Sequence, residues 1–466
     1  MQENRKVIFI NISFNSYVVH TEAVFTKLNC LFNSYCDSID YLLWWRPHPT
    51  LENNLQNYDR NLFQRYLALK AKFINSSWGV YDIDIPFETA LDLSDIYFGD
   101  CGTVAQKFMD NGKKVIYPNY TGIFFPIGIC KFKDYIYGTD HDTSAIVRYD
   151  IKKNLWEYVM PIRQTYGMQK AFHNSVTIGD RIIYIPYKAE CLVIFDAITE
   201  VIKVIDLKIK KEKVGKEKTM FWGFYYYKNM LYLIPAGYAM ILAVNMSTYK
   251  VVEQFDISDI TDQSQIITWL SWVEIEPGVL ALASMQKNQV LIIDFNLKRK
   301  QLYTVGREEF KYSEIRRWGD DLYLVVKNVP AILKWKYKED TLEEILFDQN
   351  QFGKYGKSIF DDYANTIYNG KLVCIPAKSE NAYIVNLSSK DIRKVSSLNK
   401  YIDDDISISQ FDTVVVSENE IYMQNKQYKF LIFDIETESV VEEAECRLPL
   451  VEIMQMEIDL IRSERN

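Results

Sequence analysis

The feature that most constrains this chain is a long internal repeat between about residues 119 and 450. Each copy consists of a turn, an apolar strand, a few variable residues, a second apolar strand that usually ends in Asp or Asn, a turn and a third strand. A repeat of 20–50 residues is typical of architectures in which similar units pack in series. The residues that end the second strand recur seven times, 42–50 residues apart, at Asp150, Asp196, Asn245, Asp294, Lys336, Asn386 and Asp434.

The length of each copy fits a four-stranded antiparallel sheet. A lone sheet of this kind would expose one face and two edges, whereas radial packing of several sheets buries the faces and leaves only short edges. We therefore predict a seven-bladed β-propeller over residues 119–450, followed by a C-terminal tail or closing segment over residues 451–466. The repeat resembles the Kelch and WD-type propellers in layout, without the signature dipeptides of either family. The Asp and Asn residues that end the second strands suit the following turn, because their side chains bond nearby backbone.

Residues 1–118 follow a different pattern, in which short apolar strands alternate with segments of helical periodicity. Such alternation predicts a parallel, doubly wound sheet. The predicted fold class is therefore α/β plus all-β, a single Rossmann-like lobe followed by a propeller. The predicted strands cover 6–14, 40–45, 78–84, 96–100 and 113–119, and the predicted helices cover 21–38, 51–76, 86–95 and 103–112.

Composition narrows the classes of partner and site. The net charge of −8 argues against nucleic acid as a partner, because polyanion-binding proteins usually carry a basic excess. Seven cysteines without a CxxC pair favour reduced thiols over a zinc site or a disulfide framework. No signal-peptide pattern and no long uncharged apolar run is present, so we expect a cytoplasmic protein without an integral membrane segment, either free or at the periphery of a membrane-associated biosynthetic assembly. No motif for a metal or a cofactor is found, and none is predicted.

A turn with an unusual composition follows the second predicted strand, where "YLLWW" runs into Arg46-Pro47-His48-Pro49. In open parallel sheets, ligands bind outside the carboxyl ends of the strands. Arg46 and His48 could both contact phosphate oxygens at this edge. The alternative is a loop that ends the strand, with a His that only caps the next helix.

A second turn, Gly99-Asp100-Cys101-Gly102-Thr103, lies between another predicted strand and its helix. Backbone N–H groups at the start of a helix bind anions, Gly102 allows close approach, and Thr103 could cap the helix or bond an oxygen. Any strand–turn–helix can show this motif, but two such turns at one edge of a sheet are more specific. Together they predict a donor- or phosphate-binding edge made by Arg46, His48, Asp100, Gly102 and Thr103.

The stretches "KVIFINISF", "LLWWRPHP", "WGVYDID", "LSDIYFGD", "TVAQKF" and "GKKVIYPN" resemble the C-terminal lobe of a GT-B-type transferase. The resemblance is to the CDP-glycerol glycerophosphotransferase-like proteins of bacterial cell-surface polymer synthesis. It implies that Arg46 and His48 face the phosphates of a CDP- or UDP-linked donor, and that Asp100, Gly102 and Thr103 form a second phosphate-contacting turn. The chain departs from the family in having one hydroxyl residue instead of two at that turn. Catalysis would require an acceptor-binding lobe, either from a separate chain or from a part of the protein that the given sequence lacks, and the catalytic residues are unknown.

Aromatic residues cluster where the chain reaches the predicted inner strands of the propeller. Rings exposed there could stack on sugars, with polar neighbours bonding hydroxyl groups; the alternative is that the rings pack between blades. The predicted ligand face consists of Trp222, Trp269, Arg316 and Trp318. Further aromatic candidates at similar points are His173, Phe224, Trp272, Tyr312 and Tyr363.

Two functions are compatible with these patterns. The first is a transferase-related protein of cell-surface polysaccharide or teichoic-acid-like polymer synthesis, with a lobe that binds a nucleotide-activated donor and a propeller that binds a glycan or a partner. The second is a non-catalytic interaction module, in which the propeller binds a protein or a glycan and the transferase lobe is degenerate. Binding of CDP or UDP would favour the first, and its absence would favour the second.

Overall fold

The computed structural model describes residues 5–76, 78–260, 269–347, 366–375, 381–402 and 411–463. The chain forms two compact units. Residues 1–123, 157–166 and 447–466 make up the α/β unit, and residues 124–156 and 167–446 make up the propeller unit.

The α/β unit contains a five-stranded parallel sheet in the order β3-β2-β1-β4-β5. This order places the switch point of a doubly wound sheet between β1 and β4. The strands are β1 (Lys6–Asn11), β2 (Tyr41–Trp45), β3 (Gly79–Tyr81), β4 (Ile96–Gly99) and β5 (Lys114–Ile116). The helices are α1 (Phe14–Val19), α2 (Thr21–Tyr35), α3 (Leu51–Tyr58), α4 (Arg60–Asn75), α5 (Phe87–Leu93), α6 (Thr103–Asp110) and α7 (Leu450–Arg462).

Helices cover both faces of this sheet, which explains why its strands are apolar on both sides. Ile8, Leu43 and Trp45 belong to a buried cluster with residues of α2, α4 and α7. Phe9 and Trp44, which point to the other face, pack with residues of α5 and α6. The predicted parallel α/β sheet is therefore present.

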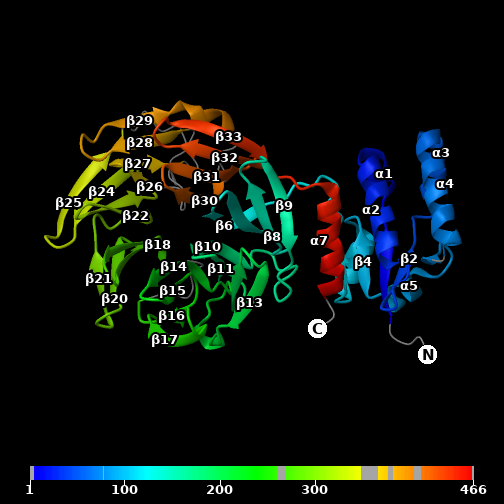
Figure 1. The fold of residues 1–466 in the computed structure, drawn as a ribbon, viewed down its shortest axis with the longest axis horizontal. Coiled ribbons are helices and arrows are strands. Elements are labelled where there is room, and N and C mark those ends of the chain that lie inside the picture. Colours follow the sequence, from blue (N-terminus) through cyan, green and yellow to red (C-terminus); the bar gives the residue numbers. More distant parts are fainter. Residues whose placement is uncertain are drawn as a thin grey trace. The chain divides into compact units, whose positions relative to one another are not determined.

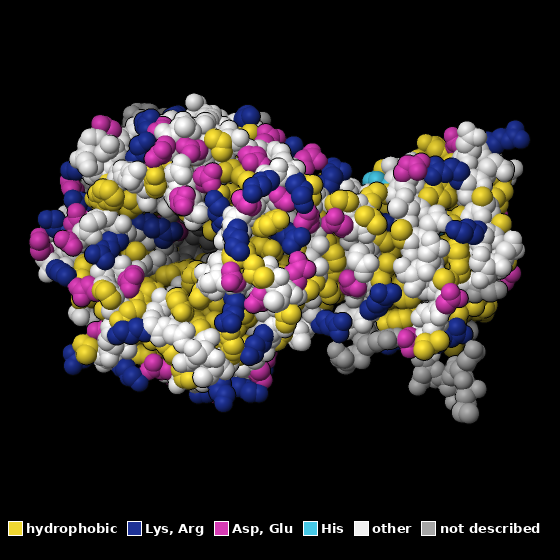
Figure 2. Space-filling model, viewed as in Figure 1, with side chains coloured by type: hydrophobic (Ala, Val, Ile, Leu, Met, Phe, Trp, Pro, Cys, Tyr) yellow, Lys and Arg dark blue, Asp and Glu magenta, His cyan; other side chains and the backbone are white. Residues whose placement is uncertain are grey.

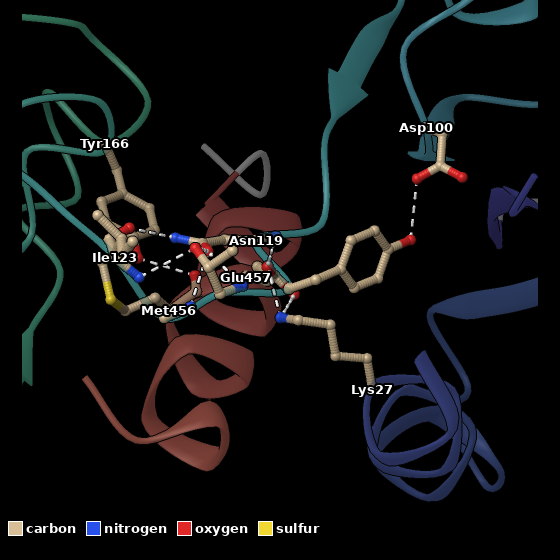
Figure 3. A network of polar contacts seen from close by, with 10 residues as sticks. Lys27, Asp100, Asn119, Ile123, Tyr166, Met456 and Glu457 are labelled. Atoms are coloured by element: carbon tan, nitrogen blue, oxygen red, sulfur yellow. Dashed lines mark hydrogen bonds and ion pairs between the residues drawn. The ribbon is translucent and has the colours of Figure 1, made fainter. Parts of the chain in front are cut away.

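The C-terminal segment folds as α7 and belongs to the α/β unit (Figure 1). A buried ion pair holds it, with Lys27 Nζ of α2 2.7 Å from Glu457 Oε1 of α7, and the two side chains are only 1% and 8% exposed. The same carboxylate accepts a hydrogen bond from the backbone N–H of Asn119 at 2.8 Å. Figure 3 shows these contacts together with the bond from Tyr166 to the backbone oxygen of Met456.

The propeller predicted from the repeat is confirmed, since the described residues form seven four-stranded sheets, each built from consecutive strands (Figure 1). Blade 1 consists of β6 (Pro126–Phe132), β7 (Tyr135–Asp140), β8 (Ile146–Asp150) and β9 (Leu155–Met160), and blade 2 of β10 (Phe172–Ile178), β11 (Arg181–Pro186), β12 (Cys191–Asp196) and β13 (Val201–Asp206). Blade 3 consists of β14 (Phe221–Tyr227), β15 (Met230–Pro235), β16 (Met240–Asn245) and β17 (Lys250–Asp256), and blade 4 of β18 (Trp269–Glu276), β19 (Val279–Ser284), β20 (Gln289–Asp294) and β21 (Arg299–Thr304). Blades 5 to 7 consist of β22 (Tyr312–Trp318), β23 (Asp321–Val326), β24 (Ala331–Lys336), β25 (Thr341–Leu346); β26 (Thr366–Tyr368), β27 (Lys371–Cys374), β28 (Ala382–Asn386), β29 (Ile392–Val395); and β30 (Phe411–Ser417), β31 (Glu420–Asn425), β32 (Lys429–Asp434), β33 (Ser439–Glu445). The inner strand of blade 7, β30, lies beside β6 of blade 1 and closes the ring.

Each repeat marker, such as Asp150 at the end of β8, is the last residue of the third strand of its four-stranded blade. The turns that leave these third strands explain the spacing of the repeat. Asp150 Oδ1 accepts hydrogen bonds from the backbone N–H groups two and three residues later, as predicted. Corresponding bonds form at Asp196, Asn245, Asp294 and Asn386. The residue four positions after each repeat marker has a positive φ of 50–64°, and these residues are Asn154, Glu200, Tyr249, Lys298, Asp340, Lys390 and Glu438.

Candidate functional site: an axial cavity in the propeller

The inner strands β6, β10, β14, β18, β22 and β30 share an irregularity near their starts, a β-bulge. In β10, His173 is an extra residue between Phe172 and Asn174, which pair with consecutive residues of β11. In β14, Trp222 is the extra residue. Bulges re-aim side chains and are common beside functional sites. Here they occur on strands that surround the propeller axis.

The inner strands enclose an axial cavity of about 330 Å³, to which all seven blades contribute. Figure 2 shows the ring hollowed at its centre. This volume lies at the lower end of the range of ~300–1,000 Å³ that is usual for small-molecule sites. The cavity wall has an aromatic arc, a polar arc, and an arc of small and aliphatic residues that includes Gly128, Thr366 and Val414.

Three neighbouring blades form the aromatic arc. The His173 ring lies against the Trp222 ring, with their centroids 4.0 Å apart. Trp222 is only 3% exposed because it also packs against Tyr187. The rings of Phe224 and Trp272 are steeply inclined to each other, with an interplanar angle of 65° and centroids 6.1 Å apart. Desolvation, together with the charge of Lys170, lowers the pKa of His173 to about 3, so its imidazole is neutral at physiological pH.

The polar arc is a cluster of three side chains from blades 4 and 5. Arg316 Nη1 lies 2.5 Å from Glu314 Oε2, and Arg316 Nη2 donates to Glu314 Oε1 at 2.8 Å. Ser271 Oγ donates to Glu314 and accepts from Arg316 Nη1 at 3.0 Å. Glu314 is buried and Arg316 is partly exposed, so the cluster presents polar atoms to the cavity while its formal charges cancel.

One polar side chain beside the cavity does not present its hydroxyl to it. Ser175 is 4% exposed, and its hydroxyl oxygen is inaccessible from the cavity and lies beside the thiol of Cys130. The Ser175 side chain therefore offers no hydrogen bond to a ligand in the cavity.

Gly223 positions the aromatic arc, and sequence reasoning did not single it out. A Cβ at this position would lie 1.9 Å from Cη2 of Trp272, so the indole lies directly on the strand backbone. A glycine inside a strand often marks such a close approach. The signal in the sequence is the isolated glycine in the otherwise aromatic run "FWGFYYY" of β14.

The sequence-predicted ligand face is only partly assembled at this cavity. Trp222 and Arg316 line it, together with the further candidates His173, Phe224 and Trp272. Trp269 does not line the cavity, because it is 1% exposed and packs in the core between blades. Trp318 lies at the far end of β22, 40% exposed, against the turn at Gly370.

Of the two remaining aromatic candidates, the structure describes one. Tyr312 is fully buried and donates to the backbone oxygen of Val305. Tyr363 lies outside the described residues.

In the α/β unit, the two predicted anion-binding turns both meet Asn11 at the end of β1. Asn11 Nδ2 donates to the backbone oxygen of Arg46 at 2.7 Å, and the Asp100 N–H donates to the backbone oxygen of Asn11 at 3.2 Å. A Cβ at Gly99 would lie 2.0 Å from that same Asn11 oxygen, so the ends of β1 and β4 are in close contact.

The charged groups of this edge already have partners within the α/β unit. Asp100 Oδ2 accepts from the N–H of Ser13 and the hydroxyl of Ser16, both at 2.7 Å. Its Oδ1 accepts from Tyr120 at 3.0 Å, the bond drawn at Asp100 in Figure 3. Arg46 Nη1 lies 2.7 Å from Asp82 Oδ2. A donor phosphate would therefore have to compete with two carboxylates.

The remaining predicted residues of the edge are exposed. His48 Nδ1 accepts from the N–H of Thr50, the residue that precedes α3, at 3.2 Å. Gly102 and Thr103 lie exposed at the start of α6. In the part of the chain that the structure describes, no three His, Cys, Asp or Glu side chains gather closely enough to hold a metal ion.

Comparisons with known proteins bear on the fold. No protein-family model matches the chain, and no curated protein matches it in sequence. A solved structure of catalytically inactive virginiamycin B lyase from Staphylococcus aureus with quinupristin is similar over 66% of this chain and 94% of that chain, with 11% identity and a TM-score of 0.50. BamB from Moraxella catarrhalis matches 68% of this chain and 87% of its own, with 9% identity and a TM-score of 0.44. The likeness is one of fold alone.

Hydropathy adds one finding. Within the described ranges, no helix is both long enough and apolar enough to cross a membrane.

Proposed function

We propose that this protein is a binding protein and that the axial cavity of the propeller unit holds a small organic ligand. The observation that carries the proposal is the convergence of bulged aromatic residues and a charge-balanced polar cluster on one cavity. Concave sites with aromatic walls and a few placed polar groups are the usual form of ligand pockets. This proposal corresponds to the non-catalytic function considered from the sequence.

Thermal unfolding of the whole chain against a library of sugars, amino acids and nucleotides tests the proposal. We expect at least one compound to raise the unfolding temperature of the wild type, and Trp272→Ala to abolish that shift. The matched control is Tyr226→Ala, which removes an exposed aromatic ring from β14 outside the cavity. If a compound still raises the unfolding temperature of Trp272→Ala, its binding site lies elsewhere and the proposal is contradicted.

A second candidate function is binding of a CDP- or UDP-linked donor at the carboxyl edge of the α/β sheet, as in a transferase of cell-surface polymer synthesis. The switch point between β1 and β4 favours it, because doubly wound sheets bind ligands there. Arg46, His48, Asp100, Gly102 and Thr103 would provide the site. Neither of the similar solved structures described above is a glycosyltransferase. A cytoplasmic location likewise stays a prediction.

Calorimetric titration with CDP, UDP and CDP-glycerol tests this second function. Binding that weakens in Arg46→Ala would support it. The absence of heat with all three nucleotides at millimolar concentration would refute it. Tyr226→Ala serves again as the control, since that residue lies in the propeller unit.

A further inference from the structure

We infer that the ligand of the axial cavity is an uncharged sugar ring. The inference rests on the proposed function, because it assigns a chemical class to the ligand of the same cavity. Three properties of the wall carry it: a flat indole surface, a set of hydrogen-bonding groups, and the cancellation of charge within the polar arc.

The flat surface is the indole of Trp272. Its ring lies on the backbone at Gly223, and Phe224 lies against it at an interplanar angle of 65°. These two contacts restrict the ring to one orientation beside the cavity. A pyranose has apolar faces of C–H bonds and a rim of hydroxyl groups, so one face of the sugar can cover an aromatic ring while the rim stays polar.

The hydrogen-bonding groups lie in the same wall. Asn174 lies in the wall and offers a side-chain amide, which both donates and accepts. The cluster of Ser271, Glu314 and Arg316 offers further acceptors and donors. A ligand rich in hydroxyl groups matches this mixture of donors and acceptors, whereas a purely apolar ligand would make none of these hydrogen bonds.

Charge balance within the polar cluster disfavours ligands that carry a net charge. The Arg316 guanidinium is neutralised by the buried Glu314 carboxylate, so a carboxylate or phosphate would find no free cation in this cluster. An ammonium group would meet Arg316 and a carboxylate that is already paired. His173 adds no charge, because its imidazole is neutral. Burying an unpaired charge is strongly unfavourable, so neutral ligands are selected.

Saturation-transfer NMR and calorimetry on the full chain test the inference, with methyl glucoside, methyl galactoside and methyl N-acetylglucosaminide as neutral probes. Glucuronate and glucosamine are the charged probes of matching size. We expect at least one neutral glycoside to bind, and each charged analogue to bind about tenfold more weakly, which corresponds to ~1.4 kcal/mol. Trp272→Ala should weaken the neutral glycoside by at least about tenfold, whereas Tyr226→Ala should leave it unchanged.

A second variant tests the role of charge directly. Glu314→Gln keeps the shape and removes the neutralising carboxylate, so Arg316 becomes free to pair with an acidic sugar. We expect the preference for glucoside over glucuronate to fall at least about fivefold. Circular dichroism and the unfolding temperature establish that each variant is folded.

The possible outcomes separate the two proposals. If a charged analogue binds more tightly than every neutral glycoside, and Trp272→Ala abolishes that binding, the sugar inference is overturned while the cavity remains the binding site. If library compounds bind through Trp272 but no sugar does, the inference also fails alone. If no compound depends on Trp272, both proposals fail.

Discussion

Replacement of Gly223 by Ala should damage the axial cavity by displacing the Trp272 ring. The added Cβ would lie 1.9, 2.2 and 2.5 Å from Cη2, Cζ3 and Cζ2 of Trp272. Ordinary contact begins at 3.4 Å, so the indole must move by about 1.5 Å. Phe224 and Trp222 pack around it, and the ring can therefore move only by rotating out of its present position.

Two effects of opposite sign determine the magnitude. Overpacking a well-packed site costs typically ~1–3 kcal/mol. Glycine inside a strand is itself unfavourable by roughly 0.5–1 kcal/mol relative to Ala, so part of that cost is recovered. We expect a net destabilisation of about 1–2 kcal/mol and, at roughly 2–4 °C per kcal/mol, a fall in unfolding temperature of several degrees.

Thermal and urea unfolding, followed by tryptophan fluorescence, measure this effect. The matched control is the double variant Gly223→Ala with Trp272→Phe, because the smaller phenyl ring relieves the contact. The double variant should be more stable than the two single changes predict, with a coupling of at least about 1 kcal/mol. Additive effects, or a Gly223→Ala variant as stable as the wild type, would refute the packing of Trp272 on this backbone.

Three further predictions concern buried ionisable groups. Lys27→Met leaves Glu457 buried without its partner and should destabilise the α/β unit by about 3–5 kcal/mol in urea unfolding, whereas adding Glu457→Gln should restore part of that loss. Burial acts to raise the pKa of Asp82, but hydrogen bonds from the N–H groups that follow it and the charge of Arg46 together lower this pKa below 3.8. The stability that the ionised Asp82 carboxylate contributes is therefore present above pH 3.8 and is lost as the pH falls further. Asp82→Asn should destabilise the protein at pH 7 and much less at pH 2. The pKa of His173 is lowered from 6.5 to about 3, so the stability that its neutral form contributes is present above pH 6.5 and is lost as the pH falls toward 3. His173→Gln should therefore flatten the pH dependence of the unfolding free energy between pH 6.5 and 3. An unchanged pH profile would contradict the buried, neutral state of His173.

The propeller could be predicted from the sequence because the turn after the third strand of most blades requires Asp or Asn, and these residues recur at a regular spacing. Asp150, Asp196 and their counterparts bond the backbone of a short turn, which requires a particular residue type at a particular place. The parallel sheet could be predicted for a similar reason, since helices on both faces require continuous apolar strands such as β2.

The candidate site was less predictable because it depends on register. A bulge shifts the pairing by one residue without changing composition, so nothing local distinguished Trp222, which lines the cavity, from Trp269, which packs between blades. The cancellation of charge between Glu314 and Arg316 also depends on the geometry of one strand. At the α/β edge, the sequence could not reveal that Asp100 bonds Ser13 and Ser16, 84–87 residues away.

The sequence also did not predict that the C-terminal helix α7 belongs to the α/β unit. Lys27 and Glu457 are 430 residues apart, and neither lies in a recognisable motif. Long-range pairs of this kind leave no periodic signal in a single sequence.

The most direct test of the central claim is a two-dimensional NMR titration that follows the indole N–H signals of the tryptophans while methyl glycosides are added to the whole protein. Trp222 and Trp272 line the cavity, whereas Trp318 is exposed at the far end of its strand. Ligand binding in the axial cavity predicts that the signals of Trp222 and Trp272 shift in a saturable manner and that the Trp318 signal stays fixed. A saturable shift confined to Trp318, or saturable binding that leaves both cavity signals unmoved, would contradict it.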